Sequence, residues 1–226
     1  MPPILISFSG IDGAGKTTQI QLLKEHLAAA GISVGELTFW DNVVVLRGLR
    51  SGFSQRVLQS DGEIGTPERP SQRRDKNVQS LPLLLFRCIL HIADTISLRR
   101  VIRKATSRPC GVVIFDRYIY DQLAALPLHA PWARGFARWL LKLAPRLDLS
   151  YVLDAVPEEA RARKPEYPLE FMRQYRESYL VLRDLAGLEV IPAGSPEDVH
   201  AAVVGRLQQY TMQATGAAEV SSAVIA

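Results

Sequence analysis

Five short runs of hydrophobic residues recur along the chain. They lie at Ile4–Ser9, Val34–Phe39, Gly111–Phe115, Leu149–Asp154 and Glu189–Ile191. Within the runs the hydrophobic positions are continuous and do not alternate with polar ones, which is typical of strands covered on both faces. The runs therefore predict a five-stranded parallel sheet with helices on either side.

Helical periodicity occupies the segments between the runs. Apolar residues recur at helical spacing within Thr17–Ala30, and Gly31 follows as a stop signal. Similar patterns predict further helices at Leu81–Thr106, Trp132–Leu143, Leu169–Ala186 and His200–Met212. Strands that alternate with helices predict a doubly wound α/β fold.

Two segments lack this order. Residues 50–80 are polar, contain several Gly, Pro, Ser and Gln residues, and carry a cluster of charges. A loop of this length in a compact domain is often a functional lid or disordered. Residues 211–226 are small and low in charge, so we expect a poorly ordered tail there. The remainder, residues 1–210, is expected to form a single domain.

Composition and charge narrow the class of protein. The chain has 226 residues, of which 47% are hydrophobic and 22% charged, an ordinary balance for a globular protein. The net charge of +4 suits a small anionic substrate and is too weak to indicate nucleic acid as a partner. The start of the chain lacks the basic segment of a signal peptide, and no apolar run is long enough to span a bilayer. We therefore expect a cytoplasmic protein that acts on a small molecule, with neither nucleic acid nor membrane as partner.

The most specific motif follows the first predicted strand. Gly10-Ile11-Asp12-Gly13-Ala14-Gly15-Lys16-Thr17 fits the phosphate-binding pattern G-x-x-x-x-G-K-[ST] at every specified position. Glycines allow successive backbone N–H groups to turn toward phosphate oxygens at the start of the next helix. Lys16 is then expected to reach the β- and γ-phosphates, and Thr17 to hold Mg²⁺. The motif predicts binding of ATP with Mg²⁺.

An acid and a base follow the third predicted strand. Asp116 and Arg117 come at its carboxyl end, the edge at which ligands bind in open α/β sheets. Asp116 can hold Mg²⁺ through water, and Arg117 can clamp a phosphate with two hydrogen bonds. A plain salt bridge is the competing interpretation, and the neighbouring phosphate-binding loop favours a functional one.

With these two elements the chain resembles the thymidylate kinase family over most of residues 4–205. The matching segments are, in chain order, Phe8 to Gln19, Asp116-Arg117-Tyr118, Pro145 to Asp154, Pro157 to Arg163, Phe171 with Tyr179, and Pro192-Ala193-Gly194. The resemblance implies a P-loop fold of the nucleotide kinase type, with a small lid near residues 157–168. It also implies ATP-dependent phosphorylation of a nucleoside monophosphate, dTMP first, and a possible homodimer.

The resemblance assigns roles on the donor side. It implies that ATP is bound by residues of the loop and by the backbone beside adenine, namely Gly10, Asp12, Gly13, Ala14, Gly15, Lys16, Thr17, Thr18 and Ala193. It implies that Mg²⁺ is held by Thr17 and Asp116. Charge that develops on the transferred phosphoryl group needs mobile cations. The expected catalytic residues are Lys16, Asp116, Arg117, Arg161 and Arg163.

The acceptor side departs from the family pattern. The segment after the second strand, Thr38–Asn42, contains no arginine, and Thr95 stands where the family carries a helical arginine. The residues after Tyr118 also differ from the usual ones. Other residues would have to rebuild the site, with Arg73, Arg74, Arg87 and Gln122 as candidates. The substrate-binding set is therefore predicted to be Asp12, Arg87, Thr95, Arg117, Tyr118 and Gln122.

These departures leave three hypotheses. The first is a nucleoside monophosphate kinase. The second is a kinase for another small acceptor, such as a nucleoside or another alcohol, for which Asp116 or Asp12 would act as base. The third is an ATP-binding module with little turnover.

An aromatic stripe lies on the helix predicted at Trp132–Leu143 and consists of Trp132, Phe136 and Trp139. We interpret it as core or packing surface, with a dimer face as the alternative.

Overall fold

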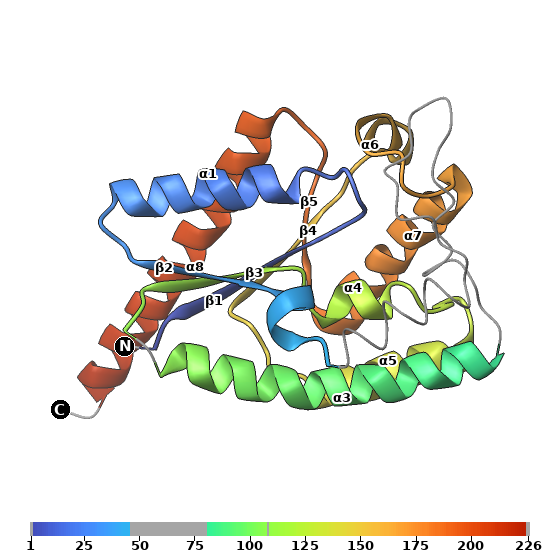
Figure 1. The fold of residues 1–226 in the computed structure, drawn as a ribbon. Helices are drawn as coiled ribbons and strands as arrows, with labels where there is room; N and C mark the ends of the chain where they lie inside the picture. Colours follow the sequence, from blue (N-terminus) through green and yellow to red (C-terminus); the bar gives the residue numbers. More distant parts are fainter. Residues whose placement is uncertain (1, 46–80, 108, 225–226) are drawn as a thin grey trace.

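The computed structural model describes residues 2–45, 81–107 and 109–224. Five parallel strands form one sheet in the order β2-β3-β1-β4-β5 (Figure 1). The strands are β1 (Ile4–Ser9), β2 (Val34–Thr38), β3 (Val112–Asp116), β4 (Leu149–Leu153) and β5 (Glu189–Ile191). All five predicted strands are confirmed, with boundaries that shift by at most one residue.

Helices cover both faces of this sheet, as the doubly wound prediction requires (Figure 1). On one face α1 (Lys16–Ala29) packs beside α8 (Pro196–Val224). The other helices are α3 (Leu81–Thr106), α4 (Ile119–Leu123), α5 (Pro131–Leu143), α6 (Pro157–Arg163) and α7 (Leu169–Ala186), with a short π-helical turn η1 (Phe39–Val43) after β2. The sequence patterns did not predict α4 or η1, each of which is only 5 residues long.

Alternate residues of each strand enter different halves of the core. Ile6 and Phe8 of β1 pack with the cluster under α1 and α8, whereas Leu5 joins the larger cluster that includes residues of α3, α5 and α7. Because successive side chains of a strand point to opposite faces, both faces of a central strand must be apolar. This explains the continuous hydrophobic runs in the sequence.

The outer helices expose more apolar surface than their sequence pattern indicates. Leu85 and Ile96 of α3 are 59% and 49% exposed. Trp132 and Trp139 of α5 are 48% and 46% exposed and lie outside the core, whereas Phe136 of the same stripe is partly buried and packs against it. The exposed side chains form an outward-facing apolar surface because α3 and α5 pack through other positions, such as Leu98 and Leu140.

Helix α8 begins at Pro196 and continues to Val224, into the segment predicted to be a poorly ordered tail. Ala and Gln in this segment favour helix, and no proline interrupts it. Most of the predicted polar loop, at about 50–80, lies outside the described residues. Within the described chain, no helix has both the length and the apolar character needed to cross a membrane.

Candidate active site

The phosphate-binding loop connects β1 to α1 at the carboxyl edge of the sheet. Gly10, Gly13 and Gly15 all have positive φ angles, of 140°, 85° and 86°. A Cβ atom added at Gly10 would lie 2.6 Å from the Leu153 carbonyl oxygen, and one at Gly13 would lie 2.3 Å from that of Ala160. At Gly15 an added Cβ meets nothing within 4 Å. The loop therefore packs against the protein on one side and has open space at Gly15, which fits a bound phosphate chain.

Lys16 lies at the start of α1 and is folded over this loop. Its Nζ donates hydrogen bonds to the carbonyl oxygens of Gly10 and Ile11, at 2.9 and 2.8 Å. Burial lowers the pKa of Lys16 to about 7, and the nearby Arg117 guanidinium acts in the same direction, while Asp12 opposes the shift. A buried ammonium group held only by carbonyl oxygens is expected to bind phosphate oxygens strongly when they arrive.

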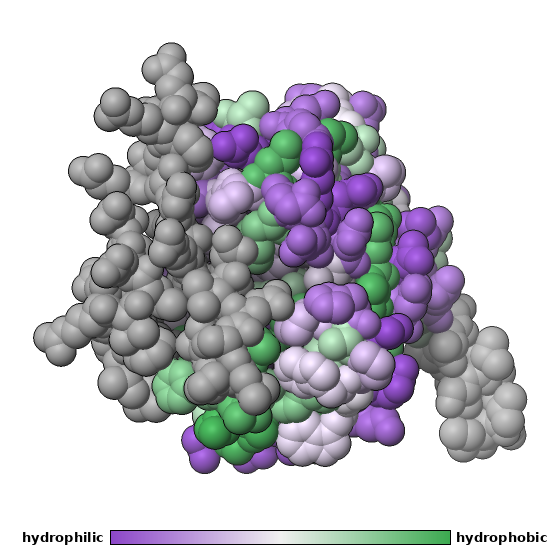
Figure 2. Space-filling view, turned by 90° about the vertical axis from the view of Figure 1, so that its right-hand side faces the viewer, coloured by the Kyte–Doolittle hydropathy of each residue, from purple (hydrophilic) through white to green (hydrophobic). Residues whose placement is uncertain are grey.

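A cavity of about 410 Å³ opens beside the loop. The predicted ATP-binding residues that line it are Gly13, Ala14, Gly15, Thr18 and Ala193. Its wall also includes Asp154, which is paired with Arg176 of α7 through two contacts of 2.5 and 2.6 Å. The sheet thus brings together the loop after β1 and the segment after β5, which are far apart in the sequence. Figure 2 views the molecule from this edge, and the described part of the surface there is largely hydrophilic.

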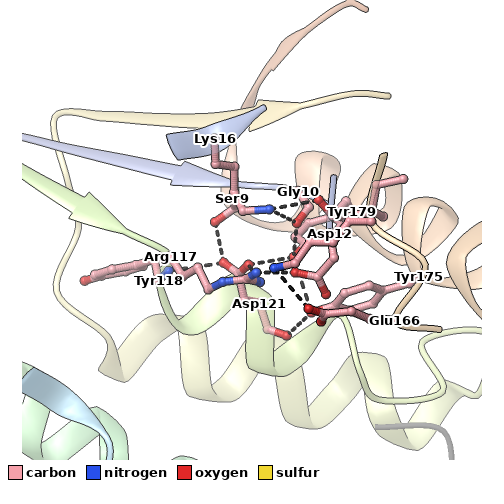
Figure 3. A network of polar contacts seen from close by, with 12 residues as sticks. Ser9, Gly10, Asp12, Lys16, Arg117, Tyr118, Asp121, Glu166, Tyr175 and Tyr179 are labelled. Carbon is pink, nitrogen blue, oxygen red and sulfur yellow. Dashed lines mark hydrogen bonds and ion pairs between the residues drawn. The ribbon is translucent and has the colours of Figure 1, made fainter. Parts of the chain in front are cut away.

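Arg117 is held between two carboxylates at the centre of the site (Figure 3). Its guanidinium pairs with Asp12 of the loop through Nη2 and with Asp121 of α4 through Nη1, the latter at 3.1 Å. Burial alone would lower the pKa of Arg117, but the two carboxylates raise it well above its usual value. Arg117 also has a φ of 68°, and no other described residue except glycine has a positive φ. Such backbone strain is common at functional sites.

Asp121 is the functional candidate that sequence analysis missed. It is almost fully buried and accepts hydrogen bonds from Ser9 Oγ at 2.6 Å, the Tyr118 backbone N–H at 3.2 Å and the Tyr179 hydroxyl at 2.8 Å. Arg117 is a fourth donor, and together the four donors engage both carboxylate oxygens of Asp121. The one signal in the sequence was a charged residue shortly after Arg117, in a segment that departs from the family pattern.

The predicted metal ligands lie at the same edge of the sheet. Thr17 is exposed in the first turn of α1, and Asp116 is half-buried at the end of β3. Burial raises the pKa of Asp116, while Arg117 and Lys16 oppose the shift. Within the described residues, no three His, Cys, Asp or Glu side chains gather closely enough to hold a metal ion. The residues therefore fit Mg²⁺ that is bound largely by nucleotide phosphates and water.

The first part of the predicted lid, Pro157–Arg163, forms the short helix α6, which contacts the phosphate-binding loop. Arg163 Nε donates a hydrogen bond to the Gly13 carbonyl oxygen at 3.0 Å, and its side chain lines the ATP-sized cavity. Arg161 is half-buried, and its Nε finds no hydrogen-bond partner in the described structure. Both predicted lid arginines thus belong to the helix that contacts the loop.

The described residues predicted for the acceptor side do not line the ATP-sized cavity beside the phosphate-binding loop. Tyr118 is fully buried, and its hydroxyl donates to the Pro145 carbonyl oxygen at 2.7 Å. Thr95 is 2% exposed, and its hydroxyl donates to the His91 carbonyl oxygen within α3 at 2.8 Å. Each hydroxyl donates to a backbone carbonyl, and the roles of Tyr118 and Thr95 in substrate binding stay predictions. Arg87 is half-buried on α3, and Arg73 and Arg74 lie outside the described residues.

Gln122 retains an acceptor that could serve a ligand. Its Nε2 donates to Asp94 Oδ2 at 2.5 Å, whereas its buried Oε1 has no hydrogen-bond partner within the described residues. Asp94 Oδ1 also accepts the backbone N–H of Val45 at 2.9 Å. A buried polar atom without a partner is costly, so a site residue of this kind often meets its partner on a ligand.

The overall arrangement is shared with solved thymidylate kinase structures. The enzyme from Candida albicans superimposes with a TM-score of 0.62 at 16% identity, covering 93% of each chain. The enzyme from Ehrlichia chaffeensis gives a TM-score of 0.57 at 19% identity, covering 92% of this chain and 99% of the other. At these identities the comparison shows a common fold.

Comparison of amino-acid sequences identifies the family as well as the fold. No family model matches the chain. A probable thymidylate kinase of Pyrococcus abyssi is 31% identical over 216 residues, covering 88% of this chain and 93% of the relative. The thymidylate kinase of Caldanaerobacter subterraneus is 28% identical, covering 91% and 95%. Because the similarity extends over nearly the full length of both sequences, the chain belongs to the thymidylate kinase family.

Proposed function

We propose that the protein is a nucleoside monophosphate kinase that transfers the γ-phosphoryl group of ATP to dTMP. The observation that carries this proposal is the position of Arg117. Its guanidinium lies next to the phosphate-binding loop, through its pair with Asp12; its side chain is 13% exposed, and its pairs with Asp12 and Asp121 fix its orientation. A fixed arginine at the edge of an ATP site is suited to hold an acceptor phosphate in line with the γ-phosphate.

The reaction follows from these positions. The bond between the γ-phosphorus and the β–γ bridging oxygen breaks, and a bond forms to a phosphate oxygen of the acceptor. That oxygen is already ionised at neutral pH, so no general base is needed. Lys16 and the lid arginines neutralise the charge on the transferred group, and Arg117 orients the acceptor. Mg²⁺, with Thr17 and Asp116 as its protein contacts, would reduce the repulsion between ATP and the acceptor.

The proposal is tested by product analysis with Mg-ATP and a panel of nucleoside monophosphates and nucleosides. We expect dTMP to stimulate ADP release and to be converted to dTDP, with Lys16→Ala losing at least a hundredfold in turnover because it removes a cation from the transferred phosphate. Lys24→Ala is the matched control, because Lys24 lies on the same helix and pairs at the surface with Glu36. Conversion of dTMP by Lys16→Ala at the wild-type rate would contradict the role of the loop.

A second acceptor class is favoured by one observation. Asp12 and Asp121 together place two negative charges around the single charge of Arg117, which weakens its attraction for a phosphate dianion. An acceptor that offers a hydroxyl group, such as a nucleoside, would not face this repulsion, and a carboxylate would serve as its base. Stimulation of ADP release by a nucleoside in the same panel, with none by any monophosphate, would support this alternative and overturn the first proposal.

We also propose that the protein forms a homodimer through the outer surface of α3 and α5. The exposed apolar side chains of this surface are Leu85, Ile89, Ile96, Trp132 and Trp139. A large exposed apolar surface commonly marks an interface, and exposed tryptophans are frequent anchors of such contacts.

A further inference from the structure

A second cavity, also of about 410 Å³, lies at the opposite end of β4 from the ATP site. We call it the basal pocket, and among the residues that line it are Tyr120, Arg138, Lys142, Arg146, Ser150 and Gly187. The ATP-sized cavity is lined by Leu153 and Asp154, at the other end of the strand. Four residues of extended chain span roughly 13 Å, so the two cavities are separate.

The charges around the basal pocket are unbalanced. Arg138 and Lys142 lie one helical turn apart on α5, on the same face, and Arg146 follows just after the helix. None of these three cations makes an ion pair or hydrogen bond with any residue that the structure describes. They therefore remain available to a ligand of opposite charge.

The two carboxylates that line the same cavity are already engaged. Asp148 accepts hydrogen bonds from the Leu5 backbone N–H at 2.8 Å and from the Tyr210 hydroxyl at 2.6 Å. Glu189 lies 3.7 Å from Arg206. The free charge of the pocket is therefore positive, which favours an anion.

The remaining lining adds hydroxyl and apolar groups. The hydroxyls of Tyr120 and Ser150 lie 3.2 Å apart. Leu141, Leu147 and Leu185 form the apolar part of the wall. Pockets of this volume accommodate metabolite-sized ligands, with apolar walls and a few polar groups that fix orientation. A phosphate group with an attached organic part matches this combination, because arginine and lysine bind phosphate through charge-assisted hydrogen bonds.

The pocket also contacts the element that holds Arg117. Tyr120 and Asp121 are neighbours in α4, and Asp121 binds Arg117. In addition, the Tyr118 hydroxyl donates to the carbonyl of Pro145, which lines the pocket, and the rings of Tyr118 and Tyr120 lie 5.0 Å apart. From this arrangement we infer that the basal pocket is a regulatory site for a small phosphorylated organic molecule. Binding of this molecule changes the position of Arg117 and therefore the affinity for the acceptor. The regulatory part of this inference rests on the proposed function, and the binding part does not.

The binding part is tested by calorimetric titration with phenyl phosphate, in the presence of saturating Mg-ADP to fill the ATP site. The double variant Arg138→Gln/Lys142→Gln is expected to bind about tenfold more weakly than wild type, because two charge-assisted contacts are lost. The control, Arg100→Gln/Arg103→Gln, removes two exposed cations from neighbouring α3 and should bind as wild type does. Absence of binding to wild type, or equal affinity in both variants, would overturn the site.

The regulatory part is tested by kinetics. Phenyl phosphate is expected to change the KM of wild type for the acceptor, with little change in kcat, and to have no effect on the Arg138→Gln/Lys142→Gln variant. If it binds at the pocket and leaves the wild-type KM unchanged, the regulatory role is wrong. Failure of the proposed function would instead appear as no turnover with any acceptor, while the titration would still report on binding.

Discussion

At the scale of the residue, the phosphate-binding loop depends on glycines whose replacement would meet backbone. Gly13 contacts the lid helix, since an added Cβ would lie 2.3 Å from the Ala160 carbonyl oxygen, whereas Gly15 faces open space. Both have φ angles in the left-handed region, which cost a residue with a Cβ roughly 1–2 kcal/mol. A side chain at Gly13 would therefore clash with α6 in addition to this strain, whereas one at Gly15 would meet only the strain.

We therefore expect Gly13→Ala to impair nucleotide binding more than Gly15→Ala. The added methyl group would push α6, with Arg163, away from the loop, and we expect the Kd for ADP to rise at least tenfold above that of Gly15→Ala. Titration calorimetry with Mg-ADP measures both. Gly135→Ala, in an open position on α5, serves as the control and should bind ADP normally. Equal affinities of the two loop variants would show that α6 does not rest on Gly13.

Asp121 is the second residue whose replacement tests the site. Asp121→Asn removes the charge that balances buried Arg117 and introduces an amide group among four hydrogen-bond donors. Breaking a buried ion pair of this kind costs about 3 kcal/mol in the free energy of unfolding. Urea denaturation measures that loss, and the KM for the acceptor should rise because Arg117 loses its orientation. Asp184→Asn, at an exposed pair with Arg183, should change stability by less than about 0.5 kcal/mol. Equal stability of the two variants would contradict the central position of Asp121.

At the scale of the element, α1 and α8 meet through two histidines. The rings of His26 and His200 have their centroids 5.8 Å apart in an edge-to-face arrangement. Burial lowers the pKa of His200, and the neighbouring His26 acts in the same direction. The unfolded chain therefore takes up a proton at this position before the folded chain does as pH falls.

The lowered pKa of His200 makes the stability of the folded protein depend on pH. The contribution of His200 to stability is present above its unfolded pKa of about 6.5 and is lost as pH falls below that value. We expect His200→Gln to reduce the fall in melting temperature between pH 6.5 and about 5. Thermal unfolding at several pH values measures this, with His129→Gln, at an exposed position, as control. The idea fails if the two variants show the same pH dependence as wild type.

Short elements were the hardest to predict from sequence. The helices α4 and η1 have too few residues to show the periodic spacing of apolar residues that indicates a helix. Nevertheless α4 carries Asp121, which pairs with Arg117. In α3 the period itself misleads, because the buried face includes His91, Asp94 and Thr95, while Leu85 and Ile96 point outward. Polar residues are tolerated inside because Asp94 and Thr95 have hydrogen-bond partners there.

At the scale of the whole molecule, the exposed apolar surface of α3 and α5 bears on assembly. Light scattering during size-exclusion chromatography should give the mass of a dimer for wild type, whereas Trp139→Glu should shift the protein toward monomer, because a buried charge at the interface is costly. Met212→Glu, at an exposed apolar position on α8, should leave the mass unchanged. A monomeric wild type, or a dimer that survives Trp139→Glu and a further Trp132→Glu change, would overturn the proposed interface.

The order of residues alone was enough to predict the sheet and to locate the phosphate-binding loop. Buried strands and the phosphate-binding loop are local patterns, since each depends on residues that are close in the chain and must meet a fixed backbone geometry. Gly10 to Thr17 could therefore be assigned from the order of the residues alone, and the cavity that Gly13 and Gly15 line lies beside that motif.

The surroundings of Arg117, the outer surface of α3 and α5 and the basal pocket could be seen only in three dimensions. Asp12 is 105 positions from Arg117, so its contact with the guanidinium depends on how the strands are ordered, whereas Asp121 is only 4 positions away and contacts it from α4. Thr95 and Tyr118 are buried in the core, where their hydroxyls donate to the backbone carbonyls of His91 and Pro145. Competition between the core and the site for the same polar group is settled by packing in three dimensions, and no local pattern records it.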